Sequence, residues 1–186
     1  MTDDVAPDIT ELLHQLRDGH ADSFERLVPL VYAELRRMAG RRLHGGEQTI
    51  GPTSLVHEVY LKLSHSPGFD ATTRGHFFAL AATAMRQIIV DRARAHLSQK
   101  RGGGQVPVSL DEAMVATDEQ AGQAIALDDA LRRLEQVDSR LRQVVECRFF
   151  AGLTEEQTAD AIGVTSRTVR SDWVKARALL GSWLQD

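Results

Sequence analysis

The 186-residue sequence contains a single cysteine, Cys147, so no disulfide can form within the chain. Cys147 lies in an amphipathic run with no evident base partner, which predicts a packed thiol rather than a nucleophile. No apolar run approaches the ~20 residues needed to cross a bilayer. The N-terminal residues, MTDDVAPDITELL, are acidic and lack the basic-then-apolar pattern of a secretory signal. We therefore expect a cytoplasmic protein with no membrane partner.

Motifs that bind metals or phosphates are also missing. The seven histidines are scattered, with no HExxH pair and no clustered carboxylates. The segment Gly102-Gly103-Gly104 follows a basic helix end and lacks the signature of a phosphate-binding loop. We predict that the protein is not an enzyme and uses no metal or cofactor. Because the net charge is −4, any contact with nucleic acid must come from local basic patches.

The remaining pattern is almost entirely helical. Apolar residues spaced three and four apart predict helices that begin near residues 8, 22, 52 and 76, the last of which runs to about residue 96. Pro29 falls inside the second segment and predicts a kink or a local restart. The pattern stops near residue 101, where three consecutive glycines begin a polar stretch, and it returns near residue 126.

In the second half, a helix is expected to start at Asp138 or Ser139. Its apolar residues, which we expect to be buried, are Leu141, Val144, Val145 and Phe149. No alternation typical of strands and no internal repeat is found. The sequence therefore predicts an all-α fold with two helical domains, 8–100 and 126–186, joined by a flexible linker, 101–125.

The C-terminal stretch GLTEEQTADAIGVTSRTVRSDWVKARALL has the pattern of two short helices joined by a tight turn. Thr154 and Gln157 have the spacing of a capping box, so a helix should begin there. Gly163 suits the left-handed conformation that ends a helix. Thr165 or Ser166 can then cap the second helix.

The second of these helices has two distinct faces. An apolar stripe should be buried, and it consists of Val169, Trp173, Ala176 and Leu180. The opposite side is mostly polar and basic, with Arg167, Arg170, Ser171, Val174 and Lys175. Charged helix faces are often merely solvated, but the turn and both caps also agree with a helix-turn-helix. We interpret the motif as one that places its second helix in the major groove of DNA.

A second basic segment ends the first domain. From residue 86 to residue 101, five basic residues stand against the acid Asp91, and these are Arg86, Arg92, Arg94, Lys100 and Arg101. The pattern is typical of a phosphate-binding stripe, and it would equally suit a solvated helix end. Phe69 and Phe78 are candidates for stacking on unpaired bases, whereas Phe77 is expected in the core.

Together these motifs resemble an extracytoplasmic-function (ECF) sigma factor. The helix-turn-helix stretch is similar to region 4, LVHEVYLKL is similar to region 2.2, and HFFALAATAMRQIIVDRARAHLSQKRGG is similar to regions 2.3 and 2.4. The order and spacing agree over nearly the whole chain. The resemblance implies a sigma factor that binds core RNA polymerase and directs promoter-specific initiation of transcription.

The resemblance also implies roles for particular residues. Region 4 would read the −35 element through Arg167, Arg170, Ser171, Val174 and Lys175. Region 2 would act on the −10 element through Phe69, Phe78, Arg86, Arg92 and Arg94. Region 2.2 would contact the polymerase clamp through Leu55, His57, Glu58, Leu61 and Lys62. Promoter DNA and core polymerase are then the expected partners, with an anti-sigma protein or a Ser/Thr kinase as further candidates.

Two alternatives stay open at this point. A helix-turn-helix regulator would bind duplex DNA without polymerase, although the first half lacks the strands of a receiver domain. Thr53 and Ser54 stand where ECF sigma factors commonly carry acids, so they are candidate phosphorylation sites. Either residue could instead simply cap the helix that follows.

Overall fold

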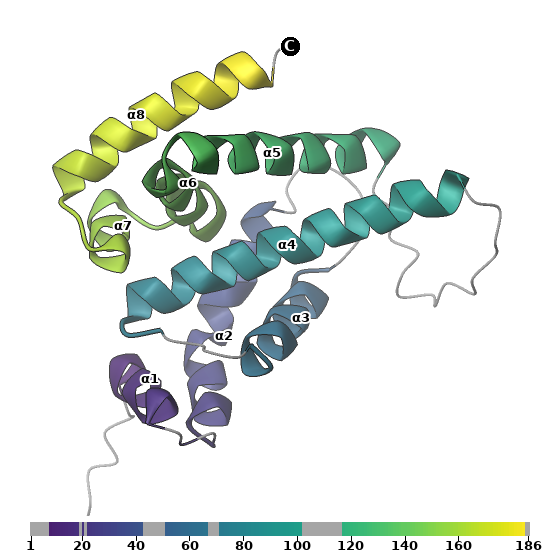
Figure 1. Ribbon diagram of the computed structural model, residues 1–186. Coiled ribbons are helices and arrows are strands. Elements are labelled where there is room, and N and C mark those ends of the chain that lie inside the picture. Colours follow the sequence, from purple (N-terminus) through teal and green to yellow (C-terminus); the bar gives the residue numbers. More distant parts are fainter. Residues whose placement is uncertain are drawn as a thin grey trace, which may run out of the picture.

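The computed structural model describes residues 8–18, 20, 22–42, 51–66, 71–101 and 117–184. Every regular element in these ranges is a helix, which confirms the predicted all-α fold. Figure 1 shows one long helix, α4, running through the middle of the molecule with the other helices arranged around it.

The first half of the chain consists of α1 (Ile9–Arg17), α2 (Asp22–Arg42), α3 (Pro52–Ser64) and α4 (Arg74–Arg101). Asp8 caps α1, and its side chain accepts a hydrogen bond from the backbone N–H of Thr10. α2 runs unbroken through Pro29, so the predicted restart does not occur. Pro29 is exposed, where water can solvate the carbonyl that lacks its helical donor.

The second half consists of α5 (Asp118–Val137), α6 (Ser139–Val145), the π-helical segment η2 (Glu146–Ala151), α7 (Glu155–Ile162) and α8 (Ser166–Trp183). α5 begins well before residue 126, because Thr117 and Gln120 form a reciprocal capping box at its start. The predicted linker is therefore too long at its C-terminal end. Most of its remainder, residues 102–116, lies outside the described residues.

The π-helical segment shifts the register of the buried face. Asp138 caps α6 as predicted, and Leu141, Val144 and Val145 are buried. A π-turn holds one more residue than an α-turn. Within this segment, Phe150 is buried in the core, and Phe149 is 42% exposed. The prediction that Phe149 is buried is wrong for this reason.

The two halves of the chain share one hydrophobic core. α4 contacts α2 and α3 of the first half, and it also contacts α5, η2 and α7 of the second half (Figure 1). Phe77 and Met85 of α4 belong to the same buried cluster as Leu131, Leu141 and Phe150. The sequence predicted two helical units but not that they pack against each other.

Candidate nucleic-acid interface

The turn between α7 and α8 has the predicted geometry. Thr154 and Gln157 form a capping box, with N···O distances of 2.9 and 3.1 Å. Gly163 ends α7 in the left-handed region, at φ 69°, where a residue with a Cβ would be strained. Thr165 caps α8 by accepting a hydrogen bond from the N–H of Thr168 at 3.2 Å. The motif is a helix-turn-helix with both caps in place.

α8 turns its only acidic residue inward. Val169, Ala176 and Leu180 are buried as predicted. Asp172 is also buried, and its carboxylate accepts a hydrogen bond from Arg140 of α6 at 2.6 Å. This bond and the charge of Asp172 raise the pKa of Arg140 above its ordinary value. The only acid of α8 is thus removed from its basic face.

The five residues predicted to read DNA all lie on the exposed side of α8. Arg167, Arg170, Ser171, Val174 and Lys175 are exposed, and Val174 has 65% of its surface in solvent. Arg170 is also held from α7, since its guanidinium bonds the carboxylate of Glu155 at 2.8 and 3.0 Å. That hydrogen bond is the main reason why the pKa of Arg170 is raised. The outer face of α8 is therefore basic, with an apolar contact point at Val174.

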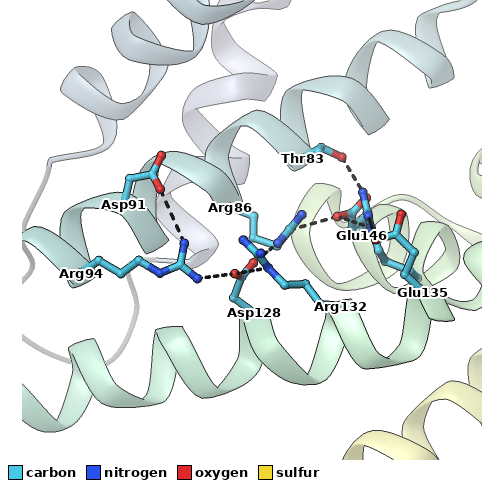
Figure 2. A network of polar contacts seen from close by, with 9 residues as sticks. Thr83, Arg86, Asp91, Arg94, Asp128, Arg132, Glu135 and Glu146 are labelled. Carbon is cyan, nitrogen blue, oxygen red and sulfur yellow. Dashed lines mark hydrogen bonds and ion pairs between the residues drawn. The ribbon is translucent and has the colours of Figure 1, made fainter.

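The residues predicted to act on the −10 element are not on one exposed face. Phe78, a candidate for stacking on unpaired bases, is instead buried, because α4 packs on both of its sides. Arg86 is also buried, and it bonds Asp128 and Glu146 of the second half (Figure 2). Phe69 lies outside the described residues.

The other two arginines of this set are partly exposed and paired. Arg92 bonds Glu58 of α3. Arg94 lies 2.9 Å from Asp128 and 3.8 Å from Asp91 (Figure 2). Three of the five basic residues in the predicted phosphate-binding stripe, Arg86, Arg92 and Arg94, are thus paired with carboxylates. Sequence reasoning missed Asp128 and Glu146, which carry no local signal that they meet α4.

α3 presents part of the predicted polymerase-binding surface. His57, Leu61 and Lys62 are exposed. Glu58 is partly exposed and paired with Arg92. Leu55 is fully buried, because it lies on the apolar stripe of α3, so its assignment to this surface is a correction.

The start of α3 differs from the capping prediction. Gly51 is the N-cap, Pro52 follows at the first turn, and no side chain caps the helix. Neither Thr53 nor Ser54 is therefore the N-cap, and both are exposed. The first turn also contains no acidic residue.

Among the residues that the structure describes, no group of three or more His, Cys, Asp or Glu side chains is placed to hold a metal ion. None of the helices described has an apolar stretch long enough to span a membrane.

Comparison with known proteins identifies the family. No curated protein is significantly similar to the chain. The family model described as "ECF sigma factor" matches residues 6–186, which include both the helix-turn-helix and the α3–α4 region. On this match over nearly its whole length, the chain belongs to the ECF sigma factor family.

Proposed function

We propose that this protein binds core RNA polymerase and directs it to promoters whose −35 element is read by α8. One observation carries the proposal. α8 follows a capped helix-turn-helix and exposes four basic residues, while its only acid, Asp172, is buried against Arg140. A helix with this surface suits the major groove, where arginine pairs with guanine and an apolar side chain contacts the thymine methyl.

Removing two arginines of α8 should abolish promoter selectivity. An arginine that contacts a base edge contributes about 1–3 kcal/mol. The double variant Arg167→Ala/Arg170→Ala should therefore lose most promoter-specific transcript in run-off transcription with core polymerase. Arg26→Ala, at an exposed position on α2, serves as the control and should retain native activity. Unchanged transcript from the double variant would exclude α8 as the reading helix.

The same assay separates this function from that of a regulator that acts without polymerase. The net charge of the chain is −4, and Arg86 and Arg94 are paired internally. We therefore expect the free protein to bind duplex promoter DNA weakly. Tight and specific mobility shifts without core polymerase would favour the regulator instead.

The exposed side of α3 is the proposed contact with polymerase. His57, Leu61 and Lys62 lie on this side, and Leu61 has 41% of its surface exposed. An apolar side chain flanked by polar ones is typical of the centre of a protein interface. The resemblance to region 2.2 supports polymerase as the partner.

A charge at Leu61 should weaken binding to core polymerase. Burial of an aspartate in the interface would leave a desolvated charge, so Leu61→Asp should raise the dissociation constant by about tenfold or more. Leu30→Asp is a matched control, because Leu30 of α2 is 40% exposed. Its affinity should match that of the native chain in a titration with labelled core polymerase. Equal losses in the two variants would argue against α3 as the contact.

Phosphorylation of Thr53 or Ser54 remains a proposal about the same surface. Both hydroxyls are exposed in the first turn of α3, which lacks an acid. A phosphate there would add negative charge beside unpaired helical N–H groups. In the polymerase titration, phosphorylated protein should bind more tightly than the unmodified, Thr53→Ala and Ser54→Ala forms. Equal affinities would exclude the switch.

A further inference from the structure

We propose that the free chain adopts a closed, inactive state in which Asp128 and Glu146 lock the second half onto α4. This state rests on the proposed function and would explain how binding of polymerase and promoter is prevented in the free chain. In the closed state Arg86 and Arg94 are paired with carboxylates of the second half. Engagement of polymerase and promoter then requires α5–α8 to separate from α4.

Asp128 of α5 is the first of the two locking carboxylates. Only 2% of Asp128 is exposed, and its carboxylate bonds three arginines. Arg86 and Arg94 reach it from α4, with Arg94 at 2.9 Å, and Arg132 reaches it from its own helix at 3.0 Å. Figure 2 shows these guanidinium groups converging on the one carboxylate.

Glu146 of η2 is the second locking carboxylate. It accepts hydrogen bonds from Arg86 at 3.0 Å and from Thr83 at 2.9 Å, both on α4 (Figure 2). Arg142 of α6 bonds the same carboxylate at 3.2 Å. The two carboxylates thus hold α4 at Thr83, Arg86 and Arg94.

Such a lock has two states rather than a range of positions. A buried carboxylate is stable only while its cationic partners stay in place. If α4 moves away, Asp128 and Glu146 lose Arg86 together and become accessible to water. Arg132 and Arg142 stay with the second half, so separation exchanges only the contacts of Thr83, Arg86 and Arg94 for hydration. Because these contacts share the two carboxylates, they are lost together, which is the behaviour required of a switch.

A close backbone approach supports the same closed state independently of charge. Gly75, in the first turn of α4, faces α7. A Cβ at this position would lie 3.1 Å from the Cβ of Ala161 and 3.3 Å from the carbonyl oxygen of Gln157. Any side chain here would push α4 and α7 apart. The contact needs glycine although glycine disfavours the helix itself.

The size of the closed state is the reason to call it inactive. The −10 and −35 elements are by name about 25 base pairs apart, or about 85 Å along B-form DNA. A compact chain of this length has a radius of gyration of about 16 Å. A body on the order of 40 Å across cannot place its two halves on both elements. Residues 102–116 can span up to about 50 Å when extended, which allows the halves to separate.

The native cysteine is a reporter of opening. Cys147 is buried in η2, which packs against α4. Burial, followed by the charge of Glu146, raises the pKa of its thiol to about 12. Loss of the α4 contact should expose this thiol and favour the reactive thiolate. Modification can be assigned without labelling, because the chain has no other cysteine.

The test measures the rate of Cys147 modification by an aromatic disulfide in the full chain at pH 8. Gly75→Val, which inserts a branched side chain against α7, should raise the rate by about tenfold or more. Asp128→Asn, which removes the carboxylate charge, should do the same. Gly122→Val is the matched control, since a Cβ at Gly122 of α5 meets nothing within 4 Å. Its rate should remain native.

Two further measurements accompany the rates. Small-angle scattering should show a larger radius of gyration for Gly75→Val and Asp128→Asn, while circular dichroism shows native helix content. Because opening no longer has to be driven by polymerase, these variants should bind core polymerase about tenfold more tightly.

Several results would overturn the inference. A folded Gly75→Val chain with the native thiol rate and native radius would exclude the lock. Equal acceleration in Gly122→Val would show that the effect is not specific to the α4–α7 contact. Open variants that bind polymerase no better than the native chain would exclude inhibition by the closed state. If the variants open but neither they nor the native chain bind polymerase, the sigma-factor proposal is refuted. The closed state would then still be supported.

Discussion

Phe78→Ala is expected to lower the free energy of unfolding by about 3–5 kcal/mol. Only 3% of Phe78 is exposed, and the residue lies in the core shared by both halves. Its ring packs edge-on against Phe77 at a centroid distance of 5.3 Å. The guanidinium of Arg74 lies 5.6 Å from the ring centroid. Truncation would remove these contacts and leave a cavity that rigid helices cannot fill.

Phe149→Ala is the matched control for this prediction. Phe149 of η2 is 42% exposed and contacts Phe150 edge-on at 5.1 Å. The same substitution there should cost about 1 kcal/mol, mainly through the loss of the ring pair. Chemical denaturation of both variants gives the comparison. Similar losses at the two positions would mean that Phe78 is not a core residue.

Stability should fall steeply in alkaline solution because of Cys147. The pKa of its thiol is raised from 9.0 to about 12 by burial and by the charge of Glu146. In the unfolded chain the thiol ionises near its ordinary pKa, so above that pH the folded state binds more protons. The free energy of unfolding should then decrease by about 1.4 kcal/mol for each pH unit. The window runs from pH 9 to about 12, and stability from this group is complete below it.

Cys147→Ala isolates the contribution of the thiol. The variant lacks the titrating group, so its stability should decline less steeply above pH 9. Tyrosine and lysine titration affects both proteins equally and cancels in the difference of slopes. Urea denaturation at pH 8, 9 and 10 measures those slopes. Parallel curves for the two proteins would contradict a raised pKa at Cys147.

Sequence reasoning succeeded where the signal is local. The capping box of Thr154 and Gln157, the left-handed Gly163 and the apolar stripe of α8 each depend on residues a few positions apart. The same kind of signal at Thr117 and Gln120 was present in the sequence, and its use would have placed the start of α5 correctly.

The errors arise where distant residues decide the outcome. Arg86 meets Asp128 and Glu146, which are 42 and 60 residues away in the sequence. A count of basic residues along a helix cannot distinguish an arginine that faces phosphate from one that faces a buried carboxylate. Phe149 and Phe150 are neighbours, and the π-helical turn that contains them determines which of the two is buried.

Because Asp172 is buried, the exposed charge of α8 is positive, in contrast to the net charge of the chain. α8 keeps four basic residues and one neutralised acid, so it carries a net charge of +3, while the whole chain carries −4. The rest of the sequence therefore sums to −7, and α8, the helix that we propose reads DNA, is a positive segment in a negative chain. In the field of a nucleic acid such a molecule is rotated during approach, with α8 leading. The net negative charge of the chain is repelled by DNA of any sequence, which shortens unproductive encounters and leaves the free protein mobile among competing duplexes.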